Sequence, residues 1–198
     1  MKKKSPLSDI LPGSILLAAP PFFLEKKNQK HKYAVMVVVS KSKFEIEALT
    51  INFREESDDR ENGCREITYY SGGSDMKTQS YILHALPHEI GSEKEIFGGL
   101  HVGGNITIVE SLAQLQRLNQ SMIRVCKGQT SWLPKELSKL LKTKQFIVAD
   151  GYLDENLLFS LGVCKDFDPD FLWGKMYEAR CSPSVITIAM TESIRFYN

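Results

Sequence analysis

The residue with the clearest potential for covalent chemistry is Cys126, which Lys127 and Gly128 follow directly. A neighbouring cation lowers the pKa of a thiol and raises its thiolate fraction, so Cys126 is the best candidate for a redox-responsive group. The alternative is a structural role, because residues 122–126 form an apolar run in which cysteine serves as a small buried hydrophobic residue. Both interpretations stay open at this point.

Paired glycines are the second feature that suits binding. Such pairs let a ligand approach the backbone closely, as in a phosphate cradle, or they form tight turns. The pairs are Gly72-Gly73, Gly98-Gly99 and Gly103-Gly104. No nucleotide-binding glycine motif accompanies them, so turns are the favoured interpretation and we expect no cofactor.

His84 and His88 have the spacing of two metal ligands on one face of a helix. Pro87 stands between them and interrupts the helix that this geometry needs. We therefore expect no metal site, and we expect His84 to end a strand and to form a hydrogen bond with a neighbour. Trp132 stands between the turn-like residues 128–131 and Pro134, where an aromatic ring either stacks on a ligand or anchors a loop to the core.

Charge limits the classes of partner. The 198 residues contain 25 Lys+Arg and 24 Asp+Glu, which leaves a net charge of +1 and gives no electrostatic basis for direct nucleic-acid binding. That alternative requires one continuous positive face on the folded chain. The lysines that would form it are Lys26, Lys27, Lys30, Lys32, Lys135, Lys139 and Lys142.

The elements that must position these residues begin with strands. Short, β-branched apolar runs predict strands covered on both faces at residues 14–19 and 33–40, and residues 45–53 predict a third strand that forms a hairpin with the second. Residues 54–66 carry nine charged side chains and predict a loop. Further strands are expected at residues 67–70, 81–85, 100–102, 106–109, 122–126 and 145–149.

Helical periodicity follows in the second half. Leu112, Leu115 and Leu118 form a stripe within residues 110–119. Pro134–Lys142 places its leucines on one face and its lysines on the other, with proline in the first turn. Residues 155–161 and 168–180 predict two more helices, and the tail predicts a hairpin. This order favours one α/β (α+β) domain with a mixed, curved sheet and flanking helices.

The chain is expected to be cytoplasmic and to have no contact with a membrane. Its apolar run at residues 14–19 follows three lysines, as in a signal peptide, but Pro20-Pro21 interrupts it. No apolar segment reaches the roughly 18 residues of a membrane span. The four cysteines have no metal-ligand spacing and do not suggest a disulfide scaffold, so we expect reduced thiols.

The order of these segments resembles the AlgH family over about residues 11–180. No single motif is specific to this family, but the order in which the motifs follow one another is. The matching segments are Gly13–Pro21, 33–39, Leu49-Thr-Ile-Asn52, Tyr70-Ser-Gly-Gly73, Leu83-His84, Phe97-Gly-Gly-Leu100, 123–132 with Pro134 and Leu137, 146–148 and 158–159. Three positions depart from the family pattern: Ser74 replaces a proline, Ser131 replaces a glycine, and Glu47-Ala-Leu replaces a Gly-x-Gly segment.

The resemblance implies a single α/β domain with a strongly curved mixed sheet. The resemblance also implies the description 'transcriptional regulator', which the family has been given because of a genetic association with alginate production. No helix-turn-helix is visible in this chain, so the label does not supply a mechanism. We expect residues 1–12 to form a flexible arm, 13–180 the AlgH-like domain, and 181–198 an extension packed on it.

The sequence thus predicts a non-enzymatic, regulatory domain that binds an unknown small ligand or protein partner. No acid–base pair or metal cluster supports catalysis. Turns at strand ends leave backbone N–H groups free for a ligand, so we expect a site where several such turns converge. The residues expected there are Asn52, Gly72, Gly73, His84, Gly128 and Trp132. A redox-responsive protein that uses Cys126 is the alternative, and a nucleic-acid-binding regulator is a further one.

Overall fold

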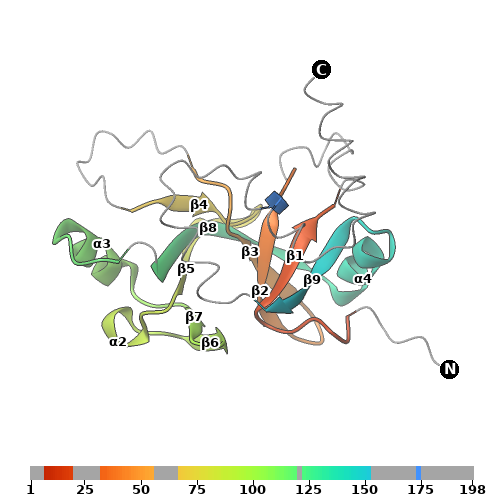
Figure 1. The fold of residues 1–198 in the computed structure, drawn as a ribbon, viewed down its shortest axis with the longest axis horizontal. Coiled ribbons are helices and arrows are strands. Elements are labelled where there is room, and N and C mark those ends of the chain that lie inside the picture. The colour runs from red at the N-terminus through yellow and green to blue at the C-terminus, as the bar shows by residue number, and fades with distance from the viewer. Residues whose placement is uncertain (1–6, 20–31, 56–66, 120–121, 153–172, 175–198) are drawn as a thin grey trace, which may run out of the picture.

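A computed structural model describes residues 7–19, 32–55, 67–119, 122–152 and 173–174 (Figure 1). Its strands are β1 (Ser14–Ala18), β2 (Val35–Lys41), β3 (Ile46–Thr50), β4 (Tyr69–Ser71), β5 (Asp75–His84), β6 (Lys94–Phe97), β7 (Leu100–Val102), β8 (Ile123–Trp132) and β9 (Phe146–Tyr152). Its helices are α2 (Pro87–Ile90), α3 (Ile106–Gln114) and α4 (Pro134–Lys142).

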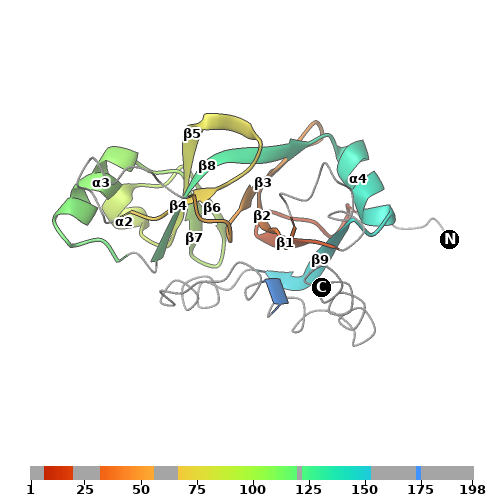
Figure 2. The same ribbon diagram turned by 90° about the horizontal axis from the view of Figure 1, so that it is seen from above.

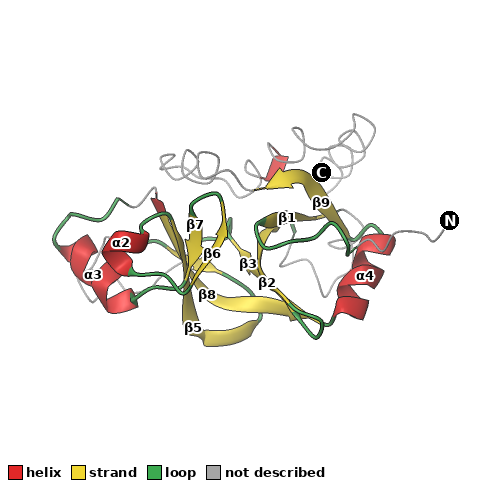
Figure 3. Cartoon of the chain, turned by 90° about the horizontal axis from the view of Figure 1, so that it is seen from below, coloured by secondary structure: helices red, strands yellow, loops and turns green. Residues whose placement is uncertain are grey.

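The strands join into one curved sheet in the order β6-β7-β5-β8-β3-β2-β1-β9, with β4 paired to β8 off this path. The β4–β8 pair is parallel and the other pairs are antiparallel, so the sheet is mixed. Helices α2 and α3 gather at one end and α4 lies at the other (Figure 3). The architecture is the single α+β domain that the sequence predicts.

Strand β8 connects the two halves of the sheet. Its first half pairs with β5 on one side and with β4 on the other, and its last three residues pair with β3 (Figures 1 and 2). One long strand therefore belongs both to the half built from β1, β2, β3 and β9 and to the half built from β4 to β7. The candidate residues Cys126, Gly128 and Trp132 lie on β8, His84 ends the neighbouring β5, and Asn52, Gly72 and Gly73 follow the neighbouring strands β3 and β4.

The buried side chains form two clusters on this sheet. The larger one takes in most of β1, β2 and β3 together with Leu137 of α4 and Phe146 of β9. The smaller one lies between β5, β8, α2 and α3 and consists of Ile82, Ile90, Val109, Ile123 and Val125. Strand β1 is buried at every position and β2 at its first five, as the continuous apolar runs predict.

Most of the predicted elements are confirmed where the structure describes them. The hairpin of β2 and β3 is antiparallel around the turn at residues 42–45. Helix α4 has the predicted bounds, and it buries Leu137. Trp173 is 5% exposed and donates a hydrogen bond from Nε1 to the carbonyl of Ala18 at 2.9 Å.

Three predictions in the second half of the chain are wrong. Residues 106–109 begin helix α3 rather than forming a strand, because the Asn105 side chain caps the helix by accepting hydrogen bonds from the N–H groups of Thr107 and Ile108. Residues 128–131 continue β8 rather than forming a turn, because pairing with β3 and β5 extends the strand to Trp132. Leu115 is 62% exposed, so the leucine stripe is not one buried face.

Several predictions lie outside the described residues. These are residues 1–6 of the arm at 1–12, most of the loop at 54–66, the helix at 155–161, all but two residues of the helix at 168–180, and the tail at 181–198. Within the described segments, no helix combines the length and the apolar content needed to cross a bilayer.

Candidate functional site

Three of the predicted site residues meet where two backbones cross. The chain leaves β4 on one side of β8 and enters β5 on the other, so the connection through Gly72 and Gly73 passes over β8. A side chain on Gly72 would overlap the carbonyl of Gly128, and one on Gly73 would overlap the backbone of Gln129. Gly128 has a φ of 72°, and a Cβ there would lie 2.8 Å from the carbonyl oxygen of Asp75. These glycines are required by the crossing.

The backbone groups of Gly72 already have partners within the protein. The Gly72 N–H donates to the Lys127 carbonyl at 2.8 Å, and the Gly72 carbonyl accepts from the Thr50 N–H at 2.8 Å. The aromatic-x-Gly-Gly motif therefore has a structural role in joining β3, β4 and β8. Nothing in this geometry reserves these groups for a phosphate.

Asn52 also uses its side chain within the fold. It is completely buried, and its Oδ1 accepts from the Val35 N–H at 2.9 Å while its Nδ2 donates to the Tyr33 carbonyl at 2.7 Å. This amide therefore fixes the chain at the start of β2, just beyond the end of β3.

His84 and Trp132 lie at opposite ends of β8. His84 pairs with Ile123, the first residue of β8, and Trp132 is the last, nine residues further on. At about 3.3 Å per residue, roughly 30 Å of strand separates the two positions. The predicted convergence of all six residues is therefore wrong: Gly72, Gly73 and Gly128 converge, and these two residues lie apart from each other.

His84 is buried within the protein. Its ring is fully buried, Nδ1 accepts from the Leu86 N–H at 3.0 Å, and the ring stacks on His101 with 5.7 Å between centroids. Burial, reinforced by His101, lowers the pKa of His84 to about 4, against the opposing effects of the Gly103 carbonyl and of Glu89. The expectation of a hydrogen-bonded strand-end histidine is confirmed. Among the described residues, no group of three metal-ligating side chains exists.

Cys126 lies in the middle of β8 and is completely buried. Its Sγ donates to the Thr50 carbonyl at 3.7 Å. Burial raises the pKa of the thiol to about 12, although the nearby Arg124 opposes the shift. The surroundings of Cys126 therefore favour the protonated thiol rather than the thiolate that redox chemistry uses.

The Trp132 ring packs on the protein's own core. It meets Phe146 of β9 edge to face, with 5.6 Å between ring centroids, and it borders the larger hydrophobic cluster. This contact joins the end of β8 to β9, which supports the anchoring role over the ligand-stacking one.

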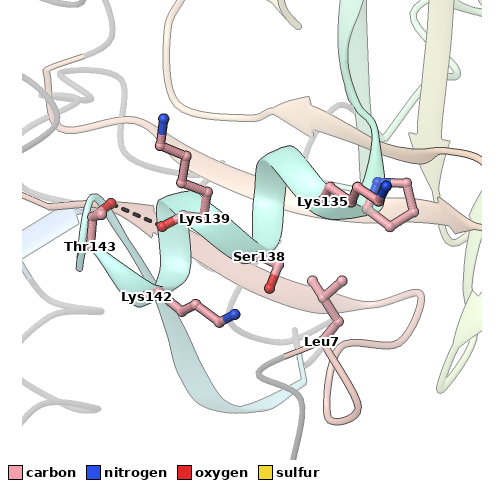
Figure 4. A pocket seen from close by; sticks show the side chains of 7 residues that line it. Leu7, Lys135, Ser138, Lys139, Lys142 and Thr143 are labelled. Carbon is pink, nitrogen blue, oxygen red and sulfur yellow. Dashed lines mark hydrogen bonds between the residues drawn. The ribbon is translucent and has the colours of Figure 1, made fainter.

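A wide, open cavity lies along α4 (Figure 4). Its volume is about 630 Å³, and it is open to solvent. The residues that line it are Leu7, Pro134, Lys135, Ser138, Lys139, Lys142 and Thr143. The volume is within the range of small-ligand sites, and no carboxylate is among these lining residues.

Helix α4 gives the cavity its charge. Lys135, Lys139 and Lys142 recur at helical spacing on one face, while Leu137 on the other face packs into the core. In Figure 4 the ammonium group of Lys142 points toward Ser138 and Leu7. The ammonium group of Lys139 points away from that of Lys142 in the same view, so the three lysines spread positive charge along α4, and this charge attracts an anion.

The other wall is the N-terminal segment that carries Leu7. Lys41, the last residue of β2, holds this segment by donating from Nζ to the carbonyls of Leu7 at 2.8 Å and of Ile10 at 2.7 Å. Both walls are thus fixed to the sheet. Sequence reasoning placed the lysines on one helix face but did not identify a site, because Leu7 comes to α4 only through this tertiary contact.

Comparisons place the chain among known proteins. The model of the AlgH-like family matches residues 23–179. A crystal structure of a Corynebacterium diphtheriae protein is similar at 15% identity with a TM-score of 0.64, covering 91% of this chain and 92% of that one. The solution structure of the AlgH protein from Pseudomonas aeruginosa is similar at 18% identity with a TM-score of 0.62, covering 94% and 97%. At these identities the likeness concerns the fold, and no curated protein matches.

Proposed function

The chain belongs to the AlgH-like family, and we propose that it is a non-enzymatic, cytoplasmic binding domain whose ligand or partner is anionic. The proposed site is the α4 cavity. The observation that carries the proposal is the set of three lysines, Lys135, Lys139 and Lys142, that line a cavity of about 630 Å³, with no carboxylate among its described lining residues.

Electrostatics supports this choice of site. An exposed ion pair contributes only about 0–1 kcal/mol, so one lysine binds an anion weakly. Three lysines line this cavity and their positive charges add, and Ser138 adds a hydroxyl donor. Gly72 and Asn52 have no such spare capacity, because the fold occupies the backbone groups of the glycine and the side chain of the asparagine.

The redox and nucleic-acid alternatives have less support. The fully buried thiol of Cys126 does not favour reaction with a soluble oxidant. A nucleic-acid surface would need to join the α4 lysines to the patch at Lys26–Lys32, of which only Lys32 lies in a described segment. The near-neutral net charge weighs against it.

Calorimetric titration with inorganic tripolyphosphate tests the proposal. We expect saturable binding that weakens on the order of tenfold in Lys139→Gln/Lys142→Gln and that falls as salt rises. Lys94→Gln is the matched control, because Lys94 is an exposed lysine on β6, outside the cavity. Equal affinity of the double variant, the control and the unmodified chain would exclude the α4 cavity.

A further inference from the structure

We propose that the anion taken by the α4 cavity is an acidic protein segment with an apolar side chain, which docks jointly on the lysines and on two exposed hydrophobic residues beside them. This inference rests on the proposed function and adds the class of partner. The two residues are Phe44, 69% exposed in the β2–β3 turn, and Leu133, 59% exposed at the start of α4.

The sheet register brings Phe44 and Leu133 to the same end of the sheet. Ile46 of β3 pairs with Trp132 of β8. Phe44 lies two residues before Ile46, and Leu133 directly follows Trp132, so both side chains leave the sheet beside the first turn of α4. The next residues of the chain, Pro134 and Lys135, already line the cavity.

The exposure of Phe44 is built into a well-defined turn. The Ser42 hydroxyl oxygen accepts hydrogen bonds from the Phe44 N–H at 3.0 Å and from the Glu45 N–H at 2.9 Å. The Ser42 N–H donates to the Glu45 carbonyl at 2.8 Å, which closes the turn. The backbone that carries Phe44 is thus fixed in one turn, so a partner that binds the ring need not order this backbone.

Leu133 is exposed for a similar reason. Its backbone N–H donates to the Glu136 carboxylate at 2.9 Å, which fixes the first turn of α4 and occupies the nearest carboxylate on that helix. The leucine side chain is left on the surface at the cavity edge. Two fixed apolar side chains next to a binding cavity suit a protein interface better than bulk solvent.

The surrounding charges select an acidic partner. Lys43 lies over the Phe44 ring, with Nζ 4.8 Å from the centroid, and Lys135, Lys139 and Lys142 continue the positive charge along α4. Glu45 and Glu136 are the acidic residues on these two elements, and Glu136 is engaged in the helix cap. A glutamate-rich segment fits the lysines, and a leucine within it fits the surface of Phe44 and Leu133.

Fluorescence anisotropy with two short labelled peptides tests the inference. One alternates glutamate and leucine, and the other has serine in place of each leucine at the same charge. We expect the full chain to bind the leucine peptide on the order of tenfold more tightly than the serine peptide. Phe44→Ser/Leu133→Ser should remove that difference, and tripolyphosphate should compete with both peptides.

Leu115→Ser is the matched control, because Leu115 is also 62% exposed but follows α3 at the other end of the sheet. It should leave the preference for the leucine peptide intact. Equal binding of the two peptides, or an unchanged preference in Phe44→Ser/Leu133→Ser, would overturn the docking surface while leaving tripolyphosphate binding in place. Failure of the proposed function would look different: neither the peptides nor tripolyphosphate would bind.

Discussion

Gly72, Gly73 and Gly128 show how much of this fold depends on single residues without a side chain. At these positions the connection between β4 and β5 lies directly on the backbone of β8. Any Cβ on Gly73 would overlap the backbone of Gln129, which cannot move without breaking its pairing with Asp75. The Gly-Gly motif is therefore explained by packing at the crossing and needs no ligand.

The substitution Gly73→Ala should lower the free energy of unfolding by more than about 3 kcal/mol, because it forces two backbones apart. Gly98→Ala is the matched control: Gly98 also has a positive φ of 52°, but the space around it is open. The control should lose only about 1 kcal/mol through backbone strain. Urea denaturation measures both, and equal losses would contradict the account of the crossing.

Cys126 should be the slowest of the cysteines to react in the native protein. Its pKa of about 12 leaves almost no thiolate at pH 7, and its side chain has no access to solvent. Alkylation resolved by mass spectrometry should modify Cys126 only in denaturant. Labelling of Cys126 under native conditions, as fast as that of a free cysteine, would restore the redox alternative.

Among the elements, those with strong local signals were predictable. Helix α4 has proline in its first turn and a clean division of leucine and lysine, so its bounds follow from sequence. The second half of β8 could not be predicted from the sequence. Gly128 and the polar residues after it have the composition of a turn, and pairing with β3 keeps them extended. The α3 start was missed because the cap at Asn105 outweighs the β-branched residues that follow it.

His84, which ends β5 and pairs with His101 of β7, should make the free energy of unfolding fall at acidic pH. Burial and the stacked His101 lower the pKa of His84 from 6.5 to about 4, so the unfolded chain binds a proton more readily than the folded one. The contribution to stability is complete above pH 6.5 and is lost as the pH falls from 6.5 to 4, by up to about 3 kcal/mol.

The substitution His84→Gln should flatten this part of the pH profile of the unfolding free energy, measured by urea denaturation between pH 4 and 7. His88→Gln serves as the control, because His88 lies exposed on α2, only four residues away. A profile of His84→Gln as steep as that of the unmodified chain would show that His84 is not the group responsible.

At the scale of the whole molecule, β8 makes the two halves of the sheet interdependent. Because the same strand pairs with β3, β4 and β5, loss of β8 would remove the backbone pairing that joins the two halves. We expect one cooperative unfolding transition, with β8 amides among the slowest to exchange hydrogen. Two separate transitions in fluorescence and circular dichroism would contradict this picture.

More of the fold than of the candidate site could be predicted from the sequence. Apolar runs and charge patterns indicate the strands, but the meeting of distant residues depends on register and on crossings that no local pattern encodes. Asn52, His84 and Trp132 were grouped because each ends or follows a predicted strand, whereas the structure distributes them along the sheet. Leu7 and Lys139 share a cavity only because Lys41 binds the N-terminal segment.

The most direct test of the central claim is a heteronuclear NMR titration of the full chain with tripolyphosphate, read at every backbone amide. The account predicts saturable shifts concentrated on α4 and on the segment around Leu7, with little change at Gly72, Gly73 and Gly128. Saturable shifts centred on the glycine crossing, or no saturable shifts at all, would contradict it.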